Sequence, residues 1–562
     1  MSKATRRDYA PIQATAQAFN LKPPIRGLNF ANTLVSMDQS DALVMNNAIA
    51  RNYGAELRKG HIQWSKGPVP GVSVNTIMQY SPARGDALSP GEGGPLGSGA
   101  KLFACSTDMK IYDVTVRGAD PVVSQEVLGQ TIPGEWSYTL FANIEKTFLL
   151  AVSDGGGYWT YETTGGWVEI PTGTAALQIE FPAGDSTTTK DFEFIFAYHG
   201  RLFFVKKNSS AIYYMIDSGA IAGKVEMFDV GPLLPHGGDI KCMAIWTVDA
   251  GDGIDDKLVM VASEGDLLIF SGTDPGDVTA WNMDGRWFVG QVPRGRRFMA
   301  QYGGDLMILC SRGLVRLSEL LRGQGLFLDM NQSVSRVNNQ LSKSLATQRE
   351  EKYFEIKLVE SERVLFINVP RVQGATGTVQ WMMDTNTLGW SHVWDIDMVT
   401  CETLRGSLFF VKPDNYIYEM FVGNTDVETP DLSGTPTSTQ QVVGELQTAF
   451  VPVGEDMRRK QFVLCKPTFQ SPSPPKLMMQ ANVNWSFKTT VGSPTGSQEE
   501  SYRWDNARWD QARWAGESGT YEGWFGLEGF GTHVSLRIKF MGDYQTIFTN
   551  WIVVANPAGV YG

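Results

Sequence analysis

The chain has 562 residues, and its formal net charge of −12 argues against a protein that grips nucleic-acid backbones, because such proteins are more often basic. Hydrophobic residues make up 42% of the chain, which is enough for real cores, and abundant glycine and aromatic residues suit many short strands joined by tight turns. The sequence predicts neither a membrane-spanning helix nor a signal peptide, because it contains no run of 18 apolar residues and its start is polar.

The five cysteines lie far apart and form no C-x-x-C motif or Cys/His cluster. An odd, scattered set of this kind predicts buried, reduced thiols in a protein made in a cytosol. The positions are Cys105, Cys242, Cys310, Cys401 and Cys465.

The first 64 residues predict an N-terminal arm and a helix. Residues 1–24 are polar, which is typical of an extended arm or strap. Asp38 or Ser40 is expected to cap a helix over residues 41–51. Three apolar side chains would then share one helix face: Ala42, Met45 and Ile49.

Residues 65–430 repeat one pattern, in which two short apolar runs flank a small polar turn. The clearest copy runs through 202–205, turns at 208–210 and returns through 212–215. Such a pattern predicts a β-hairpin. Six further hairpins begin near residues 102, 148, 258, 306, 364 and 408. Their spacing of roughly 45–60 residues is close to the blade length of β-propellers.

These hairpins predict a mainly β protein with a β-propeller of about six to seven blades. A single small sheet cannot bury both faces, whereas radial packing around a channel covers the faces and leaves only short edges. The alternative is a run of unrelated meanders within a sandwich, since the repeat is one of hairpin type and not of residue identity.

Two insertions interrupt the repeat. Residues 219–238 are rich in glycine and proline and predict a loop. Residues 331–348 predict a helix, which lies against the propeller or a neighbouring subunit, or else covers a blade edge. Its apolar positions at helical spacing are Val334, Val337, Leu341 and Leu345.

The composition changes after the repeats. Residues 431–445 are rich in Thr, Pro, Ser and Gly and predict a linker. Residues 446–562 predict a small C-terminal β-sandwich. The alternating Val534, Leu536 and Ile538 indicate a sheet with one buried face and one face exposed to solvent. The expected strands are 447–453, 460–468, 476–485, 533–540 and 545–555.

Several segments resemble one family. The segment 23–61, with its Met-Asp-x-x-Asp-Ala stretch, resembles the opening of the propeller-bearing nozzle (tail tubular B-type) proteins of short-tailed bacteriophages. The segments 199–238, 247–281 and 302–321 resemble the same family in the same order. The resemblance covers roughly residues 22–350, while the C-terminal third is similar only in style.

The resemblance implies a virion protein assembled in the host bacterial cytoplasm. It implies a self-assembled ring, expected to be a hexamer, around the distal part of the DNA ejection channel. It further implies docking to a tail adaptor ring on one side and to tail fibres or a tip protein on the other. Together with the net charge, it predicts an acidic lumen through which phage DNA passes without specific binding.

An acidic loop is a candidate for a calcium site, because closely spaced carboxylates suit this ion. The loop lacks the spacing of an EF-hand and a terminal glutamate, so an acidic turn between strands is the favoured interpretation. The candidate ligands are Asp249, Asp252, Asp255 and Asp256.

A second loop repeats Arg-Trp every five residues. Arginine over tryptophan is a cation–π pair, and both residue types anchor interfaces. The loop is therefore expected to bind a partner subunit, fibre or glycan, with a self-stacked loop as the alternative. Nucleic-acid stacking is disfavoured by the interleaved aspartates. The residues are Arg503, Trp504, Arg508, Trp509, Arg513 and Trp514.

The motifs predict no enzyme and no cofactor. The chain has no G-x-S-x-G elbow and no phosphate-binding glycine loop, and its five histidines stand singly. Two alternatives to a structural ring remain. A propeller that binds host glycan would need a solvent-facing aromatic pocket, and a glycan-degrading enzyme would need two carboxylates facing each other in a cleft.

Overall fold

The chain divides into two compact units in this computed structural model. The propeller unit comprises Lys59–Val442, and the sandwich unit combines Met1–Arg58 with Val443–Gly562. The structure describes residues 16–82, 99–127, 135–143, 146–247, 256–322, 335–348, 353–370, 379–429, 438–454, 459–487 and 519–557.

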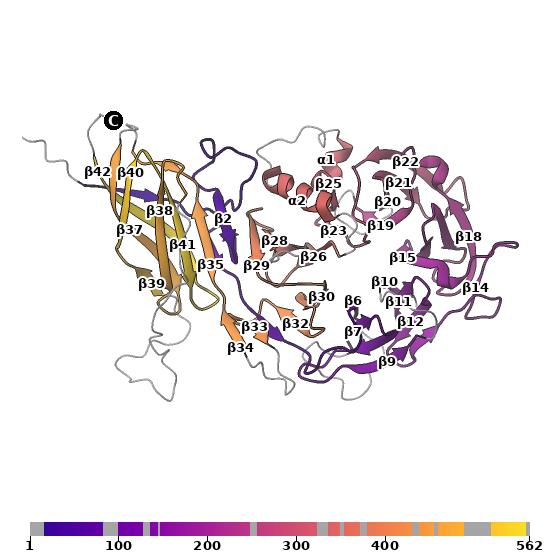
Figure 1. The fold of residues 1–562 in the computed structure, drawn as a ribbon. Helices are drawn as coiled ribbons and strands as arrows, with labels where there is room; N and C mark the ends of the chain where they lie inside the picture. The colour runs from indigo at the N-terminus through magenta and orange to yellow at the C-terminus, as the bar shows by residue number, and fades with distance from the viewer. Residues whose placement is uncertain are drawn as a thin grey trace, which may run out of the picture. The chain divides into compact units, whose positions relative to one another are not determined.

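The propeller unit is a ring of mainly antiparallel sheets that follow one another in chain order (Figure 1). The first sheet holds β6 (Val74–Tyr80), β7 (Lys101–Ser106), β8 (Lys110–Asp113) and β9 (Val122–Glu126), and the second holds β10 (Ser137–Ala142), β11 (Thr147–Ser153), β12 (Gly157–Glu162) and β13 (Gly166–Glu169). The third sheet holds β15 (Phe192–Tyr198), β16 (Arg201–Lys206), β17 (Ala211–Met215) and β18 (Gly223–Asp229), and the short β14 (Ile179–Glu180) pairs with β18. The fourth sheet holds β19 (Ile240–Trp246), β20 (Lys257–Ala262), β21 (Asp266–Gly272) and β22 (Trp281–Phe288).

The ring continues through three more sheets. The fifth sheet holds β23 (Met299–Tyr302), β24 (Asp305–Cys310) and β25 (Gly313–Arg316). The sixth holds β26 (Glu355–Val359), β27 (Val364–Asn368), β28 (Val379–Asp384) and β29 (Trp390–Trp394). The seventh holds β30 (Thr400–Leu404), β31 (Ser407–Val411), β32 (Ile417–Met420) and β5 (His61–Gln63), and it is extended by β33 (Thr425–Thr429) and β34 (Ser438–Gln441). Among the described residues, six sheets therefore hold four or more strands, and the β23–β25 sheet holds three.

The predicted β-propeller is confirmed, and every predicted hairpin forms the second and third strands of its sheet. The pair β16 and β17, for example, carries the 202–205 and 212–215 runs. These middle strands are buried on both faces, as the burial of Phe203 and Phe204 together shows. Hence they read as continuous apolar runs in the sequence.

The ring closes through a segment that precedes the first sheet. Strand β5 pairs antiparallel with β32, so that Ile62 lies opposite Glu419. His61 holds this strand in place: its Nδ1 lies 2.9 Å from Asp426 Oδ1 and its Nε2 lies 3.2 Å from the carbonyl oxygen of Val427. Two distant parts of the chain thus form one sheet.

Helix α2 (Ser335–Gln348) confirms the predicted helix and stands beside the three-stranded sheet. Val337, Leu341 and Leu345 are buried, whereas Val334 lies outside the described residues. The Asn338 amide accepts from the Leu314 N–H at 3.0 Å and donates to the Leu314 carbonyl at 3.2 Å. The Asn338 side chain therefore forms hydrogen bonds with the backbone at the edge of β25, as a fourth strand would. The short helix α1 (Leu317–Leu321) follows β25 directly.

The prediction of a loop over residues 219–238 is wrong in part. Strand β18 lies within it and pairs antiparallel with β17, and a short 3-10 turn, η2 (Gly231–Leu233), follows. In β18 only Val225 is buried, because the strand lies near the outside of its sheet. It consequently lacks the apolar alternation that identifies strands in a sequence.

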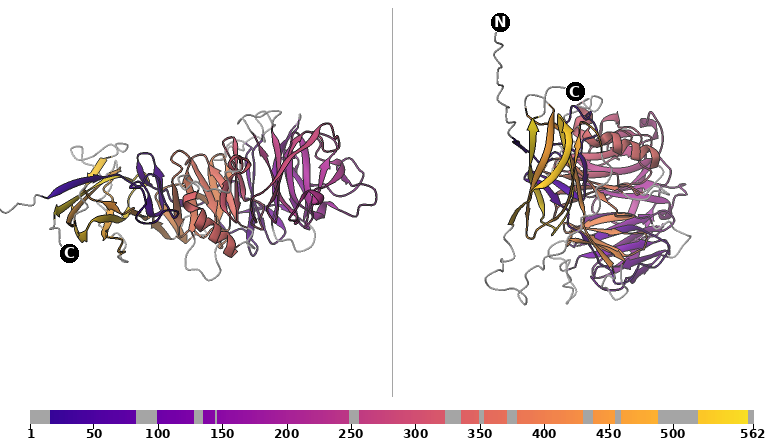
Figure 2. Two further views of the ribbon diagram at one scale, coloured as in Figure 1. Left: turned by 90° about the horizontal axis from the view of Figure 1, so that it is seen from above. Right: turned by 60° about the vertical axis from the view of Figure 1, so that its left-hand side comes forward.

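The sandwich unit consists of two sheets that pack through aromatic side chains. Phe469 contacts both Phe540 and Phe548, with ring centroids 5.5 and 5.4 Å apart. The first of these sheets contains β3 (Ala48–Arg51), β4 (Gly54–Leu57), β42 (Ile547–Pro557), β37 (Lys460–Ser471), β39 (Gly519–Glu522), β40 (Phe525–Gly531) and β1 (Gln17–Leu21). The second contains β2 (Ala42–Asn46), β35 (Gly444–Thr448), β41 (His533–Met541), β36 (Val451–Pro452) and β38 (Lys476–Val483). Figure 2 shows the indigo N-terminal strand running along the orange and yellow C-terminal strands.

The predicted helix over residues 41–51 is wrong, because these residues form β2 and β3. Asp41 does not begin a helix: its carboxylate accepts from the Asn29 amide and from the Asp38 N–H. Asn47, between the strands, has a φ of 54°, which interrupts a right-handed helix. The pairing of β2 with β35 and of β3 with β4 determines the structure of this segment, in spite of its local helix preference.

All five cysteines are buried and free, as predicted. No helix in the described part of the chain has both the length and the apolar character needed to cross a membrane.

Candidate functional site: the central cavity and its arginine pair

The innermost strands of the propeller unit surround a cavity of about 630 Å³. In Figure 1 these strands, β6, β10, β15, β19, β23, β26 and β30, lie nearest the middle of the ring. Their inward side chains are often polar, for example Asn75 and Gln79 on β6 and Lys357 on β26. Two consecutive arginines, Arg296 and Arg297, line this cavity just before β23.

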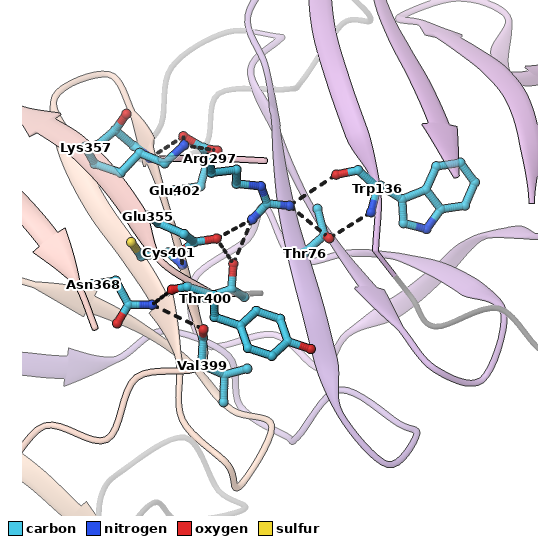
Figure 3. A network of polar contacts seen from close by, with 12 residues as sticks. Thr76, Trp136, Arg297, Glu355, Lys357, Asn368, Val399, Thr400, Cys401 and Glu402 are labelled. Carbon is cyan, nitrogen blue, oxygen red and sulfur yellow. Dashed lines mark hydrogen bonds and ion pairs between the residues drawn. The ribbon is translucent and has the colours of Figure 1, made fainter. Parts of the chain in front are cut away.

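Arg297 bonds to four neighbouring parts of the ring (Figure 3). Its Nη1 donates to Glu355 Oε1 at 2.5 Å and to Thr400 Oγ1 at 3.0 Å. Its Nη2 donates to Thr76 Oγ1 at 3.0 Å and to the Trp136 carbonyl at 3.2 Å. One planar guanidinium with several fixed donors can make all of these bonds at once.

The partners of Arg297 are themselves held in place. Glu355 also accepts from Thr400 Oγ1 at 2.8 Å and from the Cys401 N–H at 2.7 Å. Lys357 Nζ donates to both carboxylate oxygens of Glu402 at 2.7 Å. The strand starts of β26 and β30 are therefore joined by a connected polar network (Figure 3).

Arg296 extends to the remaining neighbours. Its Nη2 lies 2.5 Å from Glu193 Oε2 on β15. Its Nη1 donates to the carbonyls of Ile240 and Lys241 on β19. Its guanidinium also lies over the Phe194 ring, 5.9 Å from the centroid. Arg296 thus bonds to the sheets that contain β15 and β19, whereas the partners of Arg297 named above lie in other sheets.

Together the two arginines contact every sheet of the ring that the structure describes. Their contacts also share a position, because each lies at or just before the first residues of an inner strand: Thr76 is third in β6, Glu193 second in β15, Glu355 first in β26 and Thr400 first in β30, while Trp136 directly precedes β10. The arginine pair therefore occupies the end of the cavity at which the inner strands begin.

Burial and charge act on this network in opposite directions. Burial alone would lower the pKa of Arg297, but the negative charges of Glu355 and Glu402 outweigh it and raise that pKa above its usual value. Burial, followed by the charge of Glu402, raises the pKa of the Tyr138 phenol well above its usual range. Burial and the charge of Glu355 do the same for the pKa of the Cys401 thiol. Arg297 is thus charged, while the phenol and thiol beside it are neutral.

The described cavity wall is nearly balanced in charge. Its acidic side chains are Glu135, Asp154, Glu193, Glu355 and Glu402, and its basic ones are Lys207, Lys241, Arg294, Arg296, Arg297 and Lys357. Several are paired across the wall, such as Lys207 with Asp154. The wall does not carry the acidic excess of the chain. The acidic lumen inferred above concerns the passage of an assembled ring and stays a prediction.

The structure places one of the residues expected to bind calcium. Asp256 is partly buried and its carbonyl oxygen accepts from the Tyr198 hydroxyl at 2.7 Å, while Asp249, Asp252 and Asp255 lie outside the described residues. Within the described ranges, no three His, Cys, Asp or Glu side chains gather in a metal-binding arrangement.

The residues expected to bind a partner also lie outside the described part of the chain. This holds for Arg503, Trp504, Arg508, Trp509, Arg513 and Trp514. Their expected role therefore stays a prediction.

The arginine pair itself was not predicted from the sequence. The only local signal is the Arg-Gly-Arg-Arg run at 294–297, which precedes a strand. Its partners are remote, since Thr76 is 221 residues from Arg297. A single sequence contains no signal that connects positions so far apart.

Comparisons with known proteins identify no family. No family model matches the chain, and no curated protein matches it. Among solved structures, the β-propeller domain of Cps50 (Swd1) from Myceliophteria thermophila has 10% identity and a TM-score of 0.36, with 62% of this chain and 99% of that chain covered. BamB from Moraxella catarrhalis has 12% identity and a TM-score of 0.31, covering 69% of this chain and 95% of that chain.

Proposed function

We propose that this protein is a structural part of a short-tailed phage tail. It forms a nozzle ring, expected to be a hexamer, around the distal part of the DNA ejection channel, and it is a docking platform for the adaptor ring and fibres. The observation that carries the proposal is the series of family-like segments between residues 22 and 350, which lie in the same order as in the nozzle proteins. The β-propeller is the fold that this resemblance implies.

The central cavity of a single propeller is too small to be the DNA channel. Its volume of about 630 Å³ is that of a small-molecule pocket, far below what a DNA duplex needs. The arginine pair also fills one end of it. In the proposed ring, DNA therefore passes between copies of the chain and not along the axis of one propeller.

The same network favours a rigid building block over a catalytic centre. Glu355 and Glu402 each pair with a cation and also accept a backbone N–H, from Cys401 and Thr403 respectively. Carboxylates engaged in this way hold strands together. A glycosidase instead needs one of its two carboxyl groups to donate a proton to substrate.

The mass of the purified, full-length protein tests this proposal. Analytical ultracentrifugation of the protein alone is expected to show a closed oligomer near six times the 62.0 kDa of one chain, and with the purified adaptor ring a complex that is heavier by the mass of that ring. A chain that stays monomeric at all concentrations, with and without the adaptor, would contradict the ring.

A further inference from the structure

A second pocket lies at the seam between two neighbouring sheets of the propeller unit and plays no part in the central network. Its volume is about 430 Å³. Residues from four separate turns and strand ends line it, namely His236, Glu264, Phe288, Gly290, Gln291, Ser311 and Arg312. We propose that this pocket binds a carboxylate-bearing sugar, such as a uronic acid residue of a surface polysaccharide.

The centre of this seam pocket is an exposed aromatic ring. Phe288, the last residue of β22, keeps 39% of its surface exposed. The Arg312 guanidinium lies 5.7 Å from its ring centroid, and the His236 ring lies 4.5 Å from it at an interplanar angle of 36°. An apolar ring bordered by two nitrogen-rich side chains can contact the apolar face of a pyranose and its polar substituents together.

His236 is held in a fixed orientation by a buried carboxylate. Its Nδ1 lies 2.7 Å from Asp266 Oδ1, and its backbone N–H donates to Asp266 Oδ2 at 2.8 Å. Asp266 is only 2% exposed, whereas half of the His236 side chain is open to solvent. This arrangement directs the second ring nitrogen away from Asp266.

The other walls add hydrogen-bonding groups without closing the pocket. Gln291 donates to Glu264 Oε2 at 3.1 Å, and its carbonyl accepts from the Ser311 N–H at 2.7 Å, so the two rims are joined. Gly290 has a φ of 94°, and a Cβ there would lie 2.6 Å from Ser311 Oγ. Glycine at this position therefore lets the serine hydroxyl approach the pocket floor.

The choice of an acidic sugar follows from these groups. Arg312 offers a planar fork that matches a carboxylate, and such charge-assisted bonds are the strong ones. Glu264, Gln291 and Ser311 offer acceptors and donors for sugar hydroxyls. A simple inorganic anion would use Arg312 but gain nothing from Phe288 or Glu264.

Saturation-transfer NMR on the full-length protein tests the proposal, with D-glucuronate, D-glucose and inorganic phosphate as probes. The expected result is saturation transfer to glucuronate, with the dissociation constant raised about tenfold or more in Phe288→Ala and Arg312→Ala, since each removes a central contact. Met283→Ala is the matched control, because Met283 is also an exposed apolar residue of β22 but does not line the pocket. Thermal melting confirms that each variant is folded.

Each of the following outcomes would overturn the proposal. The first is the absence of saturation transfer to glucuronate in the wild-type protein. The second is equal binding of glucose and glucuronate, which would remove the role of the carboxylate, or displacement of glucuronate by phosphate at equal concentration, which would indicate a plain anion site. The third is an equal loss of binding in Met283→Ala. None of these results bears on the oligomeric ring, so the two proposals fail independently.

Discussion

The Arg297 guanidinium lies 2.5 Å from the Glu355 carboxylate, and this pair joins the sheet that begins at β23 to the one that begins at β26. Glu355 is nearly inaccessible, with 1% of its side chain exposed. A charge buried this deeply must keep its partner, because the energetic penalty of isolating it is large.

Replacement of Arg297 by alanine is therefore expected to destabilise the protein by about 3–5 kcal/mol, since Glu355 would remain buried without its cation. Chemical denaturation followed by intrinsic fluorescence measures this loss. Arg294→Ala is the control, because Arg294 lies in the same loop but is exposed, and it should change stability by no more than about 0.5 kcal/mol. Equal stability of the two variants would contradict a central role for Arg297.

Asn338 makes a second precise test possible. Its amide bonds both the N–H and the carbonyl of Leu314 at the edge of β25. Asn338→Ala should cost about 2–3 kcal/mol, because it leaves two buried backbone groups without a partner. Asn339→Ala is the matched control: the same residue type stands one position further along α2 and is exposed. A similar loss in both variants would show that helix propensity, and not the strand-like bonding, is responsible.

His61 is expected to control the closure of the ring. Both of its ring nitrogens face acceptors, the Asp426 carboxylate and the Val427 carbonyl. His61→Phe keeps the volume but removes both bonds, so β5 should open locally more often. Hydrogen exchange measured by mass spectrometry should then be faster in β5 and β32 and unchanged in β20 and β21. Uniform acceleration across all sheets would argue against a local closure.

His392 predicts a loss of stability in acid. Burial lowers its pKa from the ordinary 6.5 to about 3 in the folded protein. The folded state therefore holds a neutral imidazole, and its contribution is fully present above about pH 6.5, then is lost as the pH falls towards 3. The slope reaches at most about 1.4 kcal/mol per pH unit.

Urea denaturation of the wild-type protein and of His392→Gln between pH 7 and pH 4 checks this prediction. The variant should be less stable at neutral pH, because it loses the ring contact with Trp381, yet its stability should fall less steeply in acid. Parallel pH profiles for the two proteins would show that His392 does not titrate as inferred.

The sequence predicted the fold wherever burial was two-sided. Middle strands such as β20 and β21 carry continuous apolar runs, over residues 258–262 and 267–270, because both of their faces pack against neighbouring sheets. The sequence does not reveal the inner strands, since their inward positions carry polar residues such as Thr76 and Glu193, and it predicts a loop where the outer β18 lies. Each of these strands is stabilised by pairing rather than by its own composition.

The candidate site was beyond the reach of a single sequence. Arg297 and Glu355 are 58 residues apart, and nothing local marks either of them as the partner of the other. Similarly, the stretch over residues 41–51 favours a helix by spacing, but its strands pair with segments that include β35, about 400 residues later. Contacts between remote segments decide both cases.

Cryo-electron microscopy of the virion that carries this chain is the most direct test of the proposed function. The account predicts a ring of several copies at the distal end of the tail, with the DNA path between copies and with the axis of every propeller occupied by Arg296 and Arg297. Absence of the chain from the tail, or DNA density along the axis of a single propeller, would contradict it.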